Sequence, residues 1–156
     1  EYCALVLSLA SFACGSDFEI SRDGASALIE EAHEAGAIVV ASFHDFEATP
    51  GEEQLAEVLA AMNYAGADVL KFACMANSAT DAARVLAAQA WAREAYDRPV
   101  IGIAMGPSGA PTRLVGSALG CAATFATLPG WEGSSPGQFT VEQVRAVLDM
   151  VEASED

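Results

Sequence analysis

Lys71 is the only lysine in this 156-residue chain. The chain has 7 Lys and Arg residues in total, and the other six are arginines. Lys71 lies in the apolar run Val69–Ala73. An ammonium group with such neighbours loses hydration, which favours the neutral amine. A neutral amine can attack a carbonyl carbon and form an iminium, which acidifies the adjacent carbon by withdrawing electrons. The alternative is a structural lysine that reaches solvent or pairs with Asp17 or Glu19.

His44 directly follows another apolar run, Ile38–Phe43, and is the candidate general acid and base. Histidine suits that role because its protonation state changes near neutral pH. The alternative is a histidine held in a structural hydrogen bond. We expect Asp45 to cap the following loop, and we expect His33, in an acidic stretch of a predicted helix, to lie on the surface.

Two polar loops supply the candidate substrate-binding residues. Arg113 follows a loop rich in glycine and proline, and its planar guanidinium suits a carboxylate. The segment Pro129–Gln138 contains three glycines and two prolines and has no periodicity. It predicts a lid that offers Ser134 and Gln138 as hydrogen-bonding groups. The alternatives are a surface arginine near a helix start and an ordinary surface connection.

These residues must be positioned by strands and helices that alternate along the chain. Apolar, partly β-branched runs predict strands, most of them buried on both faces: Ser16–Ile20, Ile38–Phe43, Val69–Met75, Val100–Met105 and Ala122–Thr127. Apolar residues at helical spacing predict helices: Asp23–Ala35, Glu52–Ala65, Ser78–Tyr96, Thr112–Leu119 and Val141–Glu152. We expect one further helix over Tyr2–Ala13, ending near Cys14-Gly15.

The ends of several helices carry residue types that favour helix termination or initiation. Gly36 and Gly66 stand where a left-handed C-cap favours glycine. Ser78 and Thr140 are predicted N-caps, because their hydroxyls can accept a hydrogen bond from a free backbone N–H.

Five successive strand–helix units predict an α/β fold with a parallel sheet and right-handed crossovers. An open doubly wound sheet loses its main support because no strand is followed by a G-x-G-x-x-G fingerprint. A (β/α)8 TIM barrel needs about 250 residues. We therefore expect residues 1–156 to form a single partial TIM-barrel domain, about five C-terminal units of the barrel. Because the chain begins with Glu1, we expect a fragment or a trimmed chain.

Composition narrows the classes of partner. The net charge of −15 repels nucleic acid and anionic membranes, and the chain contains no stretch of eighteen apolar residues. The four cysteines form no C-x-x-C pair, so we expect no structural zinc site or disulfide framework and a reducing, cytoplasmic location.

Four segments, in order along the chain, resemble the type I 3-dehydroquinate dehydratases, Schiff-base enzymes of the shikimate pathway of aromatic amino acid biosynthesis. The family patterns are S-x-H-D-F-x-x-T-P, G-A-D-x-x-K-x-A-x-M, M-G-x-x-G-x-x-S-R and S-A-P-G-Q. They are met at Ser42–Pro50, Gly66–Met75, Met105–Arg113 and Ser134–Gln138, with Thr112 and Ser135 as mild departures. The strand that contains Asp17 and Glu19 looks like the family's D-x-E-L strand.

The resemblance implies a lyase that removes water from 3-dehydroquinate to give 3-dehydroshikimate. Lys71 would form the Schiff base and His44 would shuttle protons. Arg113 would hold the substrate carboxylate, with Ser134 and Gln138 closing over it. No metal or organic cofactor is implied, and we expect a homodimer for the full-length protein.

Two other interpretations stay open at this point. One is another lysine Schiff-base enzyme on the same barrel, such as a class I aldolase. The other is an incomplete barrel without activity, because family members carry earlier strands. We expect the acidic residue that orients the histidine to lie on one of those earlier strands, and therefore to be missing here.

Overall fold

The computed structural model describes residues 14–153. The predicted helix over Tyr2–Ala13 lies outside the described residues. Strands and helices alternate in the order β1 (Gly15–Glu19), α2 (Ala25–Glu34), β2 (Ile38–Asp45), α3 (Glu52–Tyr64), β3 (Val69–Met75), α4 (Ala79–Ala95) and β4 (Val100–Met105). The one-turn helix α5 (Thr112–Val115), the 3-10 turn η1 (Ser117–Leu119) and helix α6 (Val141–Glu152) follow.

The four strands form one parallel sheet in the order β1-β2-β3-β4, so each strand pairs with its neighbour in the sequence. A doubly wound sheet reverses direction at a switch point, whereas the strands of a (β/α)8 barrel follow one another around the barrel. The observed order is that of a barrel segment, as the sequence predicts.

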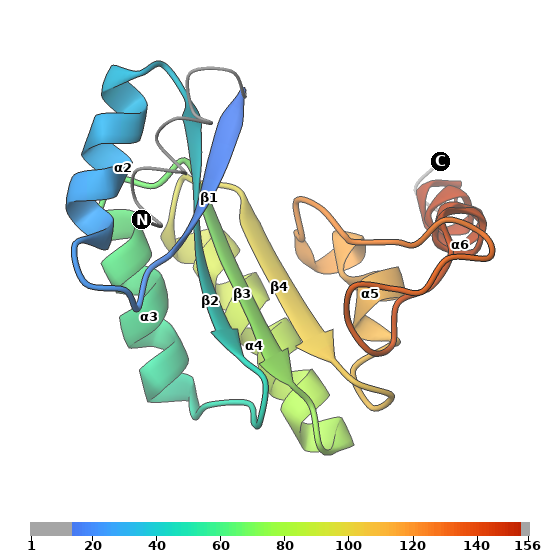
Figure 1. Cartoon of the computed structure of the whole chain (residues 1–156). Coiled ribbons are helices and arrows are strands. Elements are labelled where there is room, and N and C mark those ends of the chain that lie inside the picture. Colours follow the sequence, from blue (N-terminus) through green and yellow to red (C-terminus); the bar gives the residue numbers. More distant parts are fainter. Residues whose placement is uncertain (1–13, 154–156) are drawn as a thin grey trace.

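One face of the sheet packs against helices α2, α3 and α4, which lie together on that side in Figure 1. Alternate strand residues point to opposite faces. The residues that face the helices are apolar and fully buried, for example Phe18, Val39, Leu70 and Phe72. This layer is the main hydrophobic core and holds the strands in register.

The opposite face of the sheet carries polar side chains. The strand register places Glu19 beside Ser42 and Ser42 beside Lys71, and these residues alternate with those of the helix-facing layer. A smaller apolar cluster of Ala73, Ile101, Ile103 and Met105 lies around them on β3 and β4. Lys71 therefore sits on the face that the helices leave free.

The predicted strand over Ala122–Thr127 does not form, and that prediction is wrong. The segment makes one bridge to β4, in which Ala122 N donates to Val100 O at 2.8 Å, and one more bridge between Thr127 and Thr140. A parallel ladder would next use the N–H of Gly102, but that group donates to the Gln89 side chain at 3.1 Å. The ladder therefore stops after a single bridge.

The predicted helix Thr112–Leu119 divides at Gly116 into α5 and η1. The other helix predictions that fall within residues 14–153 hold within one or two residues at each end. Gly36 and Gly66 adopt left-handed φ angles of 82° and 86° just beyond their helices. Thr140 caps α6 through a capping box, and the Ser78 hydroxyl accepts from Asp81 N at the start of α4.

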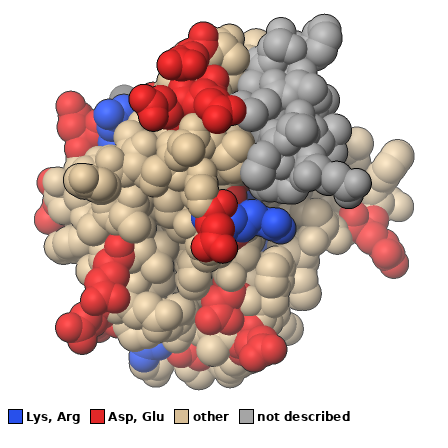
Figure 2. Space-filling view, turned by 60° about the vertical axis from the view of Figure 1, so that its left-hand side comes forward, with Lys and Arg blue, Asp and Glu red and all other residues tan. Residues whose placement is uncertain are grey.

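Acidic side chains dominate the charged surface seen in Figure 2, in keeping with the net charge of −15. Within residues 14–153, no helix has both the length and the apolar character that crossing a membrane requires.

Candidate active site

A pocket of about 170 Å³ opens at the carboxyl ends of β2, β3 and β4. All five residues predicted to act on a substrate line it: His44, Lys71, Arg113, Ser134 and Gln138. They come from two strands, the one-turn helix α5 and the loop before α6. The fold thus brings together segments that are up to 94 residues apart between His44 and Gln138.

Lys71 lines this pocket and is only 8% exposed. Its Nζ donates to Asp17 Oδ2 at 2.7 Å and lies 5.4 Å from the centre of the Phe125 ring. The other carboxylate oxygen, Asp17 Oδ1, accepts a hydrogen bond from the Ser42 hydroxyl. The pairing with Asp17 considered from the sequence is therefore present, between a buried lysine that lines the pocket and an exposed carboxylate.

His44 is held by a carboxylate and by an aromatic ring. Its Nδ1 lies 2.7 Å from Glu19 Oε2, and its ring stacks on Phe46 with the centroids 5.7 Å apart and the planes at 7°. A carboxylate on one ring nitrogen fixes the tautomer and leaves Nε2 for the substrate. The expectation that this chain lacks an acidic partner for His44 is wrong, because Glu19 on β1 supplies one.

Arg113 is 4% exposed, although it carries a full charge. Its Nη2 donates to Ser135 Oγ at 2.7 Å, while Nε and Nη1 are buried without a hydrogen-bond partner. Burial lowers the pKa of the guanidinium below its usual range. Buried donors without acceptors are costly, so this side chain is suited to an anion bound in the pocket.

The predicted lid residues bond to each other at the pocket rim. Gln138 Oε1 accepts from Ser134 N at 2.8 Å, and Gln138 Nε2 donates to Ser134 Oγ at 2.9 Å. The loop is fastened to the end of β4, because Gly106 N donates to Pro136 O at 3.2 Å. Both polar side chains are therefore placed beside Arg113 and Ser135.

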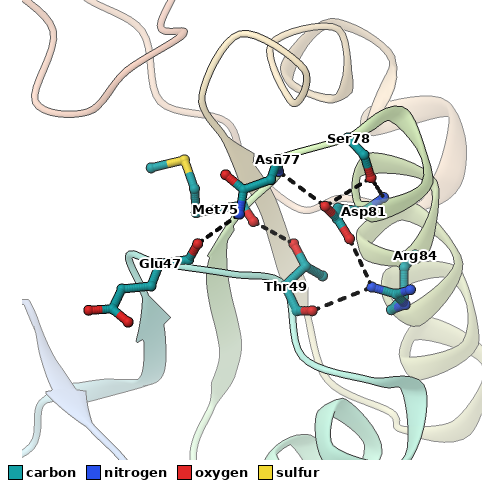
Figure 3. A network of polar contacts seen from close by, with 7 residues as sticks. All are labelled: Glu47, Thr49, Met75, Asn77, Ser78, Asp81 and Arg84. Atoms are coloured by element: carbon teal, nitrogen blue, oxygen red, sulfur yellow. Dashed lines mark hydrogen bonds and ion pairs between the residues drawn. The ribbon is translucent and has the colours of Figure 1, made fainter.

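The loop that follows β2 is tied to the loop that follows β3, as Figure 3 shows. Thr49 Oγ1 donates to Met75 O and Asn77 Nδ2 donates to Glu47 O, each at 2.8 Å. As predicted, Asp45 caps its own loop, accepting from Glu47 N and Ala48 N at 2.9 Å. These bonds join the carboxyl ends of β2 and β3, the two strands that carry His44 and Lys71.

Helix α4 anchors the same network from behind. Asp81 accepts from Asn77 N at 3.1 Å and from the Ser78 hydroxyl at 2.9 Å, and Arg84 Nη1 bridges Asp81 Oδ1 and Thr49 O. Figure 3 shows these contacts converging where the two loops meet the helix. The two loops beside the pocket are therefore hydrogen-bonded to each other and to α4.

Sequence reasoning did not assign Asp17, Glu19, Ser135 or Phe125 to the site. A usable signal was the i, i+2 spacing of the two carboxylates, which places both on one face of a strand. Among residues 14–153 the structure contains no cluster of three or more His, Cys, Asp or Glu side chains placed to hold a metal ion.

Residues 1–155 match the family model of type I 3-dehydroquinase. The chain is 39% identical over 138 residues to the 3-dehydroquinate dehydratase of Klebsiella pneumoniae (strain 342), covering 86% of this chain and 54% of that protein. It is 41% identical over 134 residues to that of Alkaliphilus oremlandii, covering 83% of this chain and 51% of the relative. The chain thus spans about half the length of the curated relatives it matches.

Solved structures agree. The 3-dehydroquinate dehydratase of Geobacillus kaustophilus HTA426 superposes with a TM-score of 0.91 at 32% identity, covering 97% of this chain and 60% of that one. The type I 3-dehydroquinate dehydratase of Clostridium difficile, solved with covalently modified comenic acid, superposes with a TM-score of 0.88 at 30% identity. The match covers 98% of this chain and 61% of that one. The expected partial-barrel fold is confirmed. The match over nearly the whole sequence shows that the chain belongs to the type I 3-dehydroquinase family.

Proposed function

We propose that this protein dehydrates 3-dehydroquinate to 3-dehydroshikimate through a Schiff base on Lys71. One observation carries the proposal: the only lysine of the chain lies buried in a pocket that His44, Arg113, Ser134 and Gln138 also line. Each of these groups has a separate task in an imine-based elimination. The names of the relatives support the same reaction.

The reaction requires Lys71 as a neutral amine. Asp17, whose Oδ2 lies 2.7 Å from Nζ and whose other oxygen accepts from Ser42, orients this amine. The neutral amine then adds to the substrate ketone, and loss of water from the adduct leaves an iminium. The covalently modified ligand in the Clostridium difficile relative supports covalent chemistry in the family.

His44 then acts as both base and acid. Its imidazole removes a proton from the carbon next to the iminium, and the electron pair of that C–H bond neutralises the iminium as an enamine. The enamine expels the hydroxyl, which takes the proton back from the imidazolium and leaves as water. Glu19 stabilises the imidazolium formed between the two steps, because its carboxylate lies 2.7 Å from Nδ1. Hydrolysis of the conjugated iminium releases the product and Lys71.

Arg113 and the lid bind rather than react. The two unpartnered nitrogens of the guanidinium can receive the substrate carboxylate, and Ser135 already orients the third. Ser134 and Gln138 can exchange their mutual hydrogen bonds for bonds to the substrate when it enters. In this scheme, the chain's own side chains carry every step.

We further propose that residues 1–156 are one partial-barrel domain of a cytoplasmic homodimer. The free thiols of Cys14, Cys74 and Cys121 are compatible with a reducing compartment. The acidic surface supports a small-molecule substrate over nucleic acid or an anionic membrane.

The test uses the full-length protein with 3-dehydroquinate, and follows the ultraviolet absorbance of the conjugated enone. Borohydride added during turnover should reduce the imine and add the mass of the ligand to the peptide that contains Lys71. Lys71→Ala should abolish both product and label, whereas Lys71→Arg separates charge from nucleophilicity and should also be inactive. Product formation by Lys71→Ala at the wild-type rate would rule out the Schiff base.

A further inference from the structure

Gln89 is a buried polar side chain that the proposed reaction does not use. It lies on α4, is 0% exposed and faces β4 rather than solvent. Its Oε1 accepts from Gly102 N at 3.1 Å, and its Nε2 donates to Gly116 O at 3.1 Å and Leu119 O at 3.3 Å. The amide therefore uses both of its donor hydrogens and its oxygen on three separate backbone groups.

These contacts join α4 to the two short elements α5 and η1. A helix of four residues is too short to be stable by itself, and its last carbonyl groups have no partners within the helix. Gln89 donates to the carbonyl of Gly116, the residue between α5 and η1, and to that of Leu119, the last residue of η1. Gly116 O also accepts from Leu119 N at 3.0 Å and from Cys121 N at 2.9 Å, so Gln89 adds a bond from another helix to a local turn. It thereby fastens the end of α5 to the long helix α4.

The Gln89 side chain packs closely against Gly102 on β4, where a larger residue would not fit. A Cβ atom on Gly102 would lie 2.7 Å from Gln89 Oε1 and 2.9 Å from Phe72 Cζ, so a side chain there would displace the amide. The next residue, Ile103, lines the active-site pocket. Gln89 thus joins one wall of the pocket to the helix that carries Arg113.

We propose that Gln89 is a positioning residue for Arg113 and thus for recognition of the substrate carboxylate. Arg113 lies three residues before Gly116 on the one-turn helix that Gln89 fastens. The guanidinium makes one side-chain hydrogen bond, to Ser135 on the lid, so its position depends on the backbone of α5. The inference rests on the proposed function, because it assigns Arg113 to the carboxylate.

The test replaces Gln89 with Leu in the full-length enzyme, which removes the amide at similar volume. Gln89→Met serves as a second variant, because its flexible chain fits the same space. The expected result is a KM for 3-dehydroquinate raised roughly fivefold to twentyfold, since small displacements of a binding group are costly. The kcat should change less than about twofold, because Lys71 and His44 lie on other elements.

Val85→Ala is the matched control, because Val85 is also fully buried on α4, one turn earlier. It should lower the melting temperature and leave KM unchanged. In an Arg113→Ala background, Gln89→Leu should raise KM no further, because the group that it positions is gone.

A wild-type KM in folded Gln89→Leu or Gln89→Met, with a raised KM in Arg113→Ala, would overturn the role of Gln89 alone. A KM raised as much by Val85→Ala would also overturn it, since the cause would be general loss of stability. Absence of turnover by the wild-type protein would instead remove the proposed function, and this inference with it.

Discussion

At the residue scale, the buried guanidinium of Arg113 has the clearest energetic consequence. Two of its nitrogens have no partner in the pocket, and a charge-assisted bond to a carboxylate contributes about 1.5–3 kcal/mol. Arg113→Ala should therefore raise KM for 3-dehydroquinate roughly tenfold to a hundredfold, with a smaller change in kcat. Arg113→Lys retains charge but not the planar fork and should recover only part of the affinity. An unchanged KM in steady-state kinetics would show that other groups hold the carboxylate.

The cysteines should differ sharply in reactivity. Burial, together with the nearby Asp45 carboxylate, raises the pKa of the Cys74 thiol to about 12, whereas Cys14 is exposed. The thiolate is the reactive form, so Cys74 should stay unmodified by iodoacetamide at pH 8 while Cys14 is alkylated. Site-resolved mass spectrometry measures both, and labelling in urea provides the control in which Cys74 should also react. Equal labelling of the two thiols in the folded protein would contradict the buried position of Cys74.

The type and neighbours of Lys71, His44 and Arg113 made them candidates with a structural alternative open for each, and all three line the pocket. Asp17 was considered only as a structural partner of Lys71, and Glu19 was not assigned to His44. Their contacts cross from β1 to β2 and β3, over sequence separations of 54 for Asp17 and 25 for Glu19. Such pairs depend on strand register, which local patterns do not encode.

At the element scale, Asp68 joins three segments at the amino-terminal edge of the sheet. Its carboxylate accepts from Val39 N at 2.8 Å, and lies 2.9 Å from His33 Nε2 on α2 and 3.6 Å from Arg98 Nη1 before β4. Partial burial acts to raise its pKa, but the hydrogen bonds with Val39 and His33 and the nearby charge of Arg98 outweigh it, so the pKa of Asp68 is lowered. His33 thus lies on the surface, as predicted, and is also paired with Asp68.

A lowered pKa in the folded state means that the ionised carboxylate stabilises the protein. This stabilisation is complete above the pKa of an unfolded aspartate, about 3.9, and is lost as pH falls through the lower folded value. Asp68→Asn should therefore lower the melting temperature at pH 7, and the difference from wild type should shrink towards pH 3. Circular dichroism melts at pH 7, 5 and 3 measure this. A difference that stays constant over that range would exclude a contribution from ionisation.

Four of the five predicted strands form, and the one over Ala122–Thr127 does not, for a reason that concerns its neighbours. The strands β2, β3 and β4 are apolar runs buried against helices, and their predicted positions are closely met. The segment Ala122–Thr127 has a similar composition, but a strand also needs a partner with free backbone groups. Gln89 occupies the next free group of β4, and no local pattern could reveal a glutamine side chain acting there.

At the scale of the whole molecule, the sheet has two edge strands, β1 and β4, and a polar face that the described helices do not cover. Ile38 is 55% exposed on it. Exposed apolar surface favours association, because each Å² left in water costs about 25 cal/mol. The 156-residue chain expressed alone should therefore associate, melt at a lower temperature and turn over less substrate than the full-length protein.

Light scattering coupled to size exclusion, thermal melts and turnover measurements on both forms provide the comparison. The net charge of −15 should keep any associated species in solution, so that they can be measured. A monomeric short form with a cooperative transition and full activity would show that this prediction is wrong.

The position of the only lysine has a use outside catalysis. A protease that cuts only after lysine has a single site in this chain, in the middle of β3, on a residue that is 8% exposed. A protease needs an extended, accessible segment, so cleavage there requires the sheet itself to open. The fraction cut over time would then report the unfolding of the barrel segment directly, as two fragments of defined length. Reduction of an imine at Lys71 Nζ would remove the cleavage site. A single digest would therefore measure both the unfolded fraction of the protein and the fraction of Lys71 that carries a reduced ligand.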